Sequence, residues 1–340
     1  MKTREPEYDV MKGIGIILML IGHIPPGYRV YHFIYSFHMP LFFIVAGRFA
    51  SILQSDEEWK RVLKKDFQRL VIPVIVTMLF VILLSPLHYI TDKNFHHVVQ
   101  EALSLLWAGD SMPTRWGDIN SPMWFLLSLF WVRTIFRFVE RYGWRQSKRH
   151  DEIVLVICAL LSVAAVLLNR HVGFPVPWGI LRGMSALLFY SIGWYIKRHG
   201  LPLFLSLGFV VVWILALKYG GIDMYEYKYN CFPLDILGAV GATWLVYLLS
   251  KGVCKITPKG SLLLQWFGVN SLLIFCIHCL DRRTYLVRAI KGVVERAFNV
   301  EIFGDASVLF HYGIEIVLVV IVTFVPFFKK VYGAKRLIEI

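Results

Sequence analysis

The chain has 340 residues, of which 57% are hydrophobic and only 17% are charged. A soluble domain of this length carries more charge and shorter apolar runs, so the composition excludes an ordinary water-soluble enzyme. The formal net charge of +13 does not favour a nucleic-acid-binding protein, because the basic residues are clustered between apolar runs. Membrane topology and anionic lipid headgroups account for that placement.

Apolar runs of about twenty residues recur along the chain, which is typical of a polytopic helical membrane protein and not of a β-barrel. We expect an all-α fold, a single domain over residues 1–340, with about ten transmembrane helices around an intramembrane cavity. The expected spans are 11–25, 33–53, 69–90, 121–138, 152–168, 179–197, 202–218, 233–250, 261–280 and 311–330.

The distribution of basic residues predicts the orientation. With the N-terminus inside, 23 Lys and Arg residues lie in cytoplasmic segments and 11 in outer segments. Positive charge is retained on the cytoplasmic side of membrane proteins. We therefore expect the chain to lie in the cytoplasmic (inner) membrane, with both termini in the cytoplasm and membrane lipids around it.

The five cysteines predict neither a disulfide framework nor a metal centre. Their number is odd, and most of them fall within apolar helices. Cys276 and Cys279 bracket His278, but no second ligand pair accompanies them. We predict that no metal is bound.

The stretch from Asp9 to Gly47 holds two apolar runs, each with a histidine, His23 and His38. An ionisable group inside a membrane helix is expensive and by default marks a functional site. Lys12 precedes His23 by eleven residues, or three helical turns, so the two side chains share one face about 16 Å apart along the axis. We expect both to face a common cavity.

The pattern of Lys12, ten residues and His23 resembles the Arg/Lys-x10-His motif of the acyltransferase family 3 membrane proteins. The segment SFHMPLFFIVAG resembles that family's second-helix signature, and Asp9 lies where its first helix carries an acidic residue. Within the family, the chain is most similar to the fucose 4-O-acetylase-like branch. The resemblance implies an O-acyltransferase that moves an acetyl or other short acyl group from acyl-CoA to a hydroxyl of a sugar or cell-surface glycan.

Such a transfer needs a base for the acceptor's proton, and histidine suits this task because its pKa lies near physiological pH. We expect His23 to be that base, with Lys12 and Asp9 completing the catalytic set at the cytoplasmic end. Direct transfer is favoured over a serine acyl-enzyme, because the sequence has no Gly-x-Ser-x-Gly motif. An acyl-histidine intermediate remains an alternative.

Basic residues of the second and third apolar runs are the expected sites for acetyl-CoA. Arg69 precedes LVIP, which resembles the family's third-helix entry, where many members have Arg-x-x-Arg. This chain has Asp66 in place of the first arginine, with Lys65 beside it. We expect Arg69, Lys65 and Arg48 to bind the donor; the alternative is that they are positive-inside anchors.

The fourth apolar run ends through four arginines at intervals of four residues, at 133, 137, 141 and 145. This spacing places them on one face of a helix. They form a basic stripe at the cytoplasmic surface that attracts either the phosphates of CoA or anionic lipids.

The acceptor is expected to meet aromatic faces and hydrogen-bonding groups. The candidates for substrate binding are His38, Tyr35, Trp124, Arg182, Ser271, His278, Trp116 and Asp118. Ser271 and His278 are seven residues apart, so they share one helix face, and Arg182 is a lone arginine within an apolar run. An alternative function, a glycan or lipid transporter or flippase, also explains buried ionisable groups, but the family-like motifs argue against it.

Overall fold

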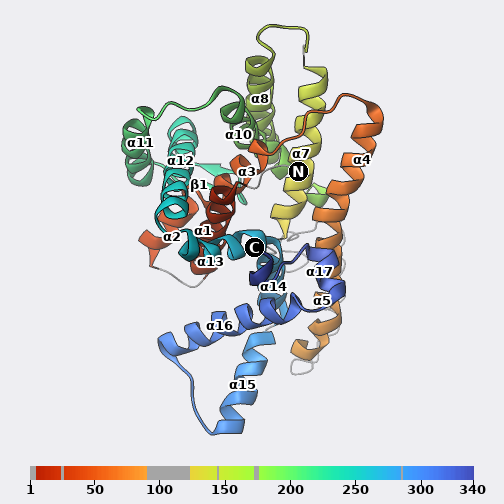
Figure 1. The fold of residues 1–340 in the computed structure, drawn as a ribbon, viewed down its shortest axis with the longest axis vertical. Helices are drawn as coiled ribbons and strands as arrows, with labels where there is room; N and C mark the ends of the chain where they lie inside the picture. The colour runs from red at the N-terminus through yellow and green to blue at the C-terminus, as the bar shows by residue number, and fades with distance from the viewer. Residues whose placement is uncertain (1–4, 24–26, 90–122, 144, 172–175, 285) are drawn as a thin grey trace.

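The computed structural model describes residues 5–23, 27–89, 123–143, 145–171, 176–284 and 286–340 (Figure 1). Helices make up nearly all of this part of the chain, as expected. The α-helices are α1 (Pro6–His23), α2 (Tyr28–Tyr35), α3 (His38–Arg48), α4 (Asp56–Asp66), α5 (Ile72–Tyr89), α7 (Trp124–Tyr142), α8 (His150–His171), α9 (Ile180–Ser185), α10 (Leu187–His199), α11 (Leu205–Tyr219), α12 (Phe232–Ile256), α13 (Pro258–Val269), α14 (Ser271–Thr284), α15 (Leu286–Phe298), α16 (Gly304–Val322) and α17 (Pro326–Tyr332).

The part of the chain that the structure describes also has three short non-α helices: the π-helix η1 (Phe67–Val71) between α4 and α5, and the 3-10 helices η2 (Pro177–Gly179) and η3 (Leu337–Glu339). Two strands, β1 (Ile222–Asp223) and β2 (Lys228–Tyr229), pair antiparallel with Ile222 opposite Tyr229. The expectation of an all-α chain is therefore correct except for this hairpin between α11 and α12.

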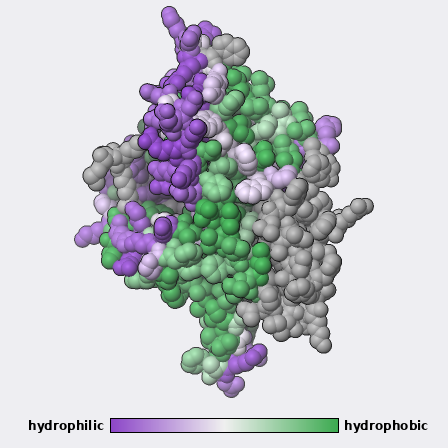
Figure 2. All heavy atoms as spheres, turned by 90° about the vertical axis from the view of Figure 1, so that its right-hand side faces the viewer, coloured by the Kyte–Doolittle hydropathy of each residue, from purple (hydrophilic) through white to green (hydrophobic). Residues whose placement is uncertain are grey.

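Within the described residues, five helical segments are long and apolar enough to cross a membrane, and the bent pair α13–α14 makes six. The expectation of a membrane protein is confirmed, whereas the count of about ten spans stays a prediction. Figure 2 shows apolar side chains over the middle of one face and hydrophilic ones towards its upper end, where α4 lies. An apolar surface of this kind is what lipid tails solvate.

Glycines allow the central helices to touch along their backbones. A Cβ at Gly268 of α13 would lie 1.8 Å from the carbonyl oxygen of Asp9 in α1, and one at Gly13 would lie 2.1 Å from that of Leu264. Small residues at helix interfaces permit such close approach in membranes. The α1–α13 contact thereby fixes the helix that carries Asp9, Lys12 and His23.

Two expected spans are interrupted. The run 33–53 divides into α2 and α3 at Ser36 and Phe37, so that His38 begins α3. The run 261–280 is broken at Asn270, where α13 and α14 meet at a bend of 56°. The Asn270 side chain donates to the Lys335 carbonyl oxygen and accepts from the Lys335 amide. The backbone of the C-terminal segment thus satisfies the polar side chain at the break.

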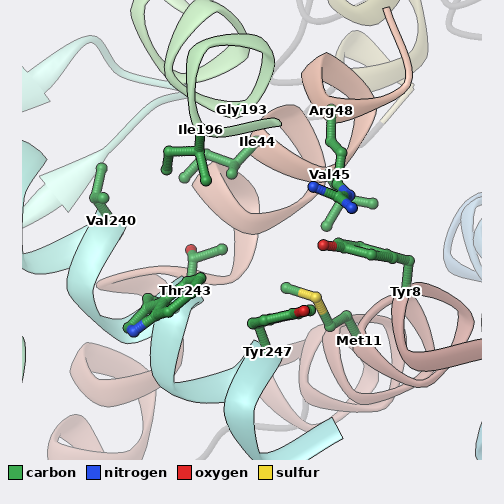
Figure 3. A pocket seen from close by; sticks show the side chains of 11 residues that line it. Tyr8, Met11, Ile44, Val45, Arg48, Gly193, Ile196, Val240, Thr243 and Tyr247 are labelled. Carbon is green, nitrogen blue, oxygen red and sulfur yellow. The ribbon is translucent and has the colours of Figure 1, made fainter. Parts of the chain in front are cut away.

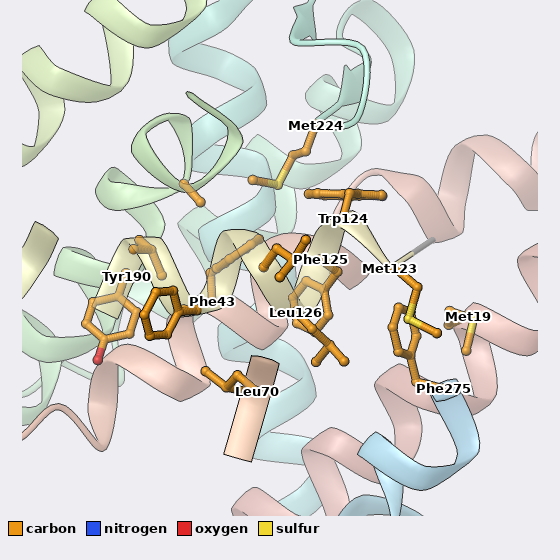
Figure 4. Close-up of a cluster of buried hydrophobic side chains, with 14 of the residues drawn as sticks. Met19, Phe43, Leu70, Met123, Trp124, Phe125, Leu126, Tyr190, Met224 and Phe275 are labelled. Atoms are coloured by element: carbon orange, nitrogen blue, oxygen red, sulfur yellow. The ribbon is translucent and has the colours of Figure 1, made fainter. Parts of the chain in front are cut away.

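The main hydrophobic core lies between α1, α3, α5, α7, α10 and α14. Figure 4 shows its side chains in a row from Tyr190 through Phe43 and Leu126 to Phe275 and Met19. Met19 lies one turn before His23, so this core connects the middle of the helix bundle with the histidine at the end of α1.

Candidate active site

Asp9 and Lys12 lie on one turn of α1 and form an ion pair of 2.8 Å. Lys12 also lines a cavity of about 210 Å³ between α1, α3, η1, α7 and α14. The other lining residues are Ile16, Met19, Met39, Phe42, Val45, Ala46, Phe49, Leu70, Phe125, Leu126, Leu129, Ser271, Leu272 and Phe275. Apart from Lys12 and Ser271 the lining is apolar. A flexible, weakly polar chain fits such a space, with a cation near one end.

His23 ends α1 and is half-buried. Its Nδ1 lies 2.8 Å from the carbonyl oxygen of Met19. Because a carbonyl oxygen only accepts hydrogen bonds, Nδ1 carries the hydrogen, and in the neutral ring Nε2 holds the lone pair. The side chain of Met19 lines the cavity. The local helix thus sets the tautomer of His23, one turn beyond a residue that lines the cavity.

His278 of α14 lies beside His23, with their ring centroids 5.0 Å apart. His278 is buried, and its Nδ1 lies 3.0 Å from Oε1 and 3.3 Å from Oε2 of Glu315 in α16. Glu315 is also buried, with 2% of its surface exposed. A carboxylate accepts from the imidazole Nδ1–H, so Glu315 orients His278.

A second histidine extends this network towards the surface. Nε2 of His311 lies 2.9 Å from Asp281 Oδ2 and 3.5 Å from Glu315 Oε1, and the His311 side chain is 36% exposed. Asp281, His311 and Glu315 bring ligand atoms within 4.8 Å of one another, which is compatible with a metal ion. Hydrogen-bonded ion pairs explain the same geometry, and the prediction that no metal is bound stays a prediction.

Sequence reasoning missed Glu315, His311 and Asp281. The signal for Glu315 is present in the sequence, because a single acidic residue stands within the apolar run of α16. Most of α16 is exposed in the structure, yet its glutamate is buried against α14. Its partner, by contrast, is 37 residues away in the chain and no local pattern identifies it.

His38 and Tyr35 lie on the same side of the site as His23. The His38 ring is buried, and its Nδ1 lies 2.9 Å from the Ile34 carbonyl oxygen. The Tyr35 ring lies 4.7 Å from the His38 ring and packs over Gly22, where an added Cβ would be 3.3 Å from it. Three predicted site residues, His23, His38 and Tyr35, are therefore brought together.

Trp124 and Arg182 form a separate aromatic cluster under the β-hairpin. The guanidinium group of Arg182 lies 4.4 Å from the ring centroid of Tyr225 and 5.9 Å from that of Trp124. Arg182 Nε also donates to the Tyr225 carbonyl oxygen at 3.1 Å. The expectation that a lone membrane arginine has partners is met here by aromatic rings and a backbone carbonyl group.

The three residues expected to bind the donor are dispersed. Arg48 pairs with Glu5 at 2.8 Å and lies over the Tyr8 ring, beside a small cavity of about 40 Å³ (Figure 3). Lys65 and Arg69 are exposed, and neither lines the cavity of Lys12. Trp116 and Asp118 lie outside the described residues.

The fold thus brings the imidazole of His23, the His278–Glu315 pair and an apolar cavity lined by Lys12 to one part of the molecule. An imidazole ring in such a set can accept a proton from a hydroxyl group. A family model described as an acyltransferase domain matches residues 5–328. No curated protein and no solved structure matches the chain.

Proposed function

The chain belongs to acyltransferase family 3 and is a membrane acyltransferase, and we propose that it transfers an acetyl or other short acyl group from acyl-CoA to a hydroxyl of a sugar or cell-surface glycan. The observation that carries the proposal is the position of His23. Its ring lies 5.0 Å from that of His278, and its Nδ1 partner, Met19, lines the cavity that Lys12 also lines. The fucose 4-O-acetylase-like branch remains a prediction within this family.

In the proposed reaction, Nε2 of His23 takes the proton of the acceptor hydroxyl as its oxygen attacks the thioester carbonyl carbon. The new C–O bond forms, the C–S bond breaks, and the thiolate leaves with the proton from His23, so that acyl ester and CoA thiol are the products. Glu315 places a negative charge beside His278 and hence near His23. That charge stabilises the imidazolium state formed during the transfer.

The donor occupies the cavity in this proposal, with its phosphates near Lys12 and its thioester near Met19. Lys12 and His23 are about 16 Å apart along α1, a separation that the extended pantetheine arm can span. Asp9 holds the Lys12 ammonium group at 2.8 Å and so positions it at the cavity. Lys12 and Asp9 thus act on the donor, away from the reacting carbonyl group.

The acceptor approaches from the side of Tyr35 and His38. Both offer hydrogen-bonding groups next to His23, and Tyr35 offers an aromatic face to a sugar ring. Ser271 lines the donor cavity, on the same helix as His278. Trp124, Arg182, Trp116 and Asp118 remain candidates for the more distant parts of a glycan.

Mass spectrometry of surface glycans tests the reaction and the acceptor together. Glycans from cells that express the wild-type protein are compared with those from cells expressing His23→Ala or the control His171→Ala, a change at an exposed histidine of α8. We expect a mass increase of one acyl unit with the wild type and the control only. Identical glycan masses in all three strains, with equal protein levels, contradict a glycan acceptor.

A further inference from the structure

Asp66, the residue that departs from the family-like arginine pattern, lies at the centre of a charged cluster. It is 2% exposed and pairs with two arginines of α7, the buried Arg137 and the 26% exposed Arg133. The Arg133 Nη2 atom lies 3.1 Å from Asp66 Oδ1. Because one carboxylate faces two guanidinium groups that stay protonated in proteins, the cluster has one positive charge in excess.

Several hydrogen-bond donors of this cluster have no acceptor among the described residues. They are Nε and Nη2 of Arg137 and Nε of Arg133. The Arg137 side chain is only 3% exposed, so water does not readily replace a missing partner. The buried Tyr190 hydroxyl lies beside Arg133 and adds a polar group to the cluster. Buried donors without acceptors are rare in native proteins and call for a ligand or water.

The cluster lies one helical turn beyond the donor cavity on two helices. On α7, Leu129 lines the cavity and Arg133 follows four residues later on the same face. On the other side, Leu70 of η1 lines the cavity and Asp66 precedes it by four residues. Phe125 and Arg133 are about 12 Å apart along α7, so the cluster lies within reach of a ligand in the cavity.

We propose that Arg133 and Arg137, held by Asp66, form a subsite for a phosphate ester at the end of the apolar cavity. Guanidinium groups match phosphate oxygens in geometry, and the orphan N–H groups and the excess charge call for an anion of this kind. The inference rests on the proposed function in taking the phosphates of acyl-CoA as the source. The headgroup of an anionic phospholipid has the same chemistry and is the other source.

The test measures binding, independently of acyl transfer. Purified protein in phosphatidylcholine nanodiscs is titrated with CoA, with inorganic pyrophosphate and with pantetheine, which lacks phosphates. We expect Arg133→Gln to weaken CoA and pyrophosphate binding about tenfold or more and to leave pantetheine binding unchanged. Arg133→Lys should lose less affinity for CoA and pyrophosphate than Arg133→Gln, because it keeps the positive charge. Arg61→Gln, at an arginine that is 75% exposed on the neighbouring α4, is the matched control.

The variant Asp66→Asn distinguishes a loss of anion binding from a loss of protein stability. Removal of the internal carboxylate should tighten pyrophosphate binding several-fold if the arginines bind an anion, even where the melting temperature falls. A second arm measures phosphatidylglycerol retained by each variant from mixed-lipid nanodiscs. If Arg133→Gln changes only lipid retention, the subsite binds a lipid headgroup and its assignment to acyl-CoA is wrong.

Equal affinities of all variants for every phosphate probe overturn the subsite altogether. The proposed function fails in a different way: wild-type protein would then bind pyrophosphate but show no added affinity for CoA or pantetheine in the cavity. The two outcomes are therefore distinguishable in one set of titrations.

Discussion

The imidazole rings of His23 and His278 lie with their centroids 5.0 Å apart, although 255 positions separate the two residues in the chain. His23 comes from α1 and His278 from α14, and Glu315 of α16 accepts a hydrogen bond from the latter. Three helices from opposite ends of the sequence thus meet at one point. A set of titratable side chains gathered within apolar helices is typical of a functional centre.

Glu315→Gln should lower turnover about tenfold or more, because the acceptor of the His278 Nδ1–H becomes a neutral amide oxygen and the imidazolium state loses its counter-charge. Acyl-CoA binding should change little, since Glu315 does not line the donor cavity. Steady-state turnover and donor affinity are measured on the purified variant. Glu301→Gln, at an exposed glutamate, is the control. Unchanged turnover in Glu315→Gln removes the carboxylate from the mechanism.

Lys12→Ala should raise the KM for acyl-CoA more than the KM for the acceptor, because Lys12 is the cation that lines the cavity. Arg69→Ala is expected to act in the same direction, with a smaller effect because Arg69 is exposed. Initial rates at varied donor and acceptor concentrations provide both constants. If the donor KM is the same in wild type and both variants, Lys12 and Arg69 do not bind the donor and serve only as positive-inside anchors.

Gly268→Ala should destabilise the protein by about 1–3 kcal/mol, because the added methyl group overlaps the Asp9 carbonyl oxygen at 1.8 Å. The matched control is Gly252→Ala, where no atom lies within 4 Å of the added Cβ and alanine favours the helix. Thermal unfolding in one detergent compares the two. A Gly268→Ala variant as stable as Gly252→Ala contradicts the tight α1–α13 contact.

Much of α1 follows from the sequence. The spacing of Lys12 and His23 and the acidic residue at Asp9 are local features, and helical periodicity alone places them on one helix. The cavity is lined by Lys12 and by Met19, the hydrogen-bond partner of His23. Lys12 lines this cavity and His23 does not, so the expectation that both face a common cavity stays a prediction, as do their catalytic roles.

The features of the site that the sequence did not predict depend on contacts between segments far apart in the chain. The pairing of His278 with Glu315 joins two helices whose relative position no periodicity reveals. Asp66 is a departure from a motif when read alone, and only its contact with Arg137 and Arg133 explains it. The β-hairpin over Arg182 was also missed, because each of its strands has only two residues.

Sealed vesicles of known orientation test where the two substrates enter. His23 lies about 16 Å from Lys12 along α1, over half of a hydrocarbon core of about 30 Å, so the reaction centre should lie nearer the outer face. We expect transfer when acyl-CoA is supplied on the cytoplasmic face and the acceptor on the outer face. The acceptor's path should include residues 108–122, which lie outside the described residues. A requirement for both substrates on the cytoplasmic face contradicts this arrangement.

The most direct test of the proposed mechanism is the turnover of purified His23→Ala. The substrates are acetyl-CoA and the unacylated form of the glycan that mass spectrometry finds acylated in cells with the wild-type protein. Release of CoA thiol and formation of the acyl ester are measured together, with His171→Ala as the control and thermal unfolding as the check on folding. Loss of a general base removes a factor of about 10²–10⁴ in rate, and the account predicts a loss of this size with a folded protein. Near-wild-type turnover of a folded His23→Ala variant would contradict it.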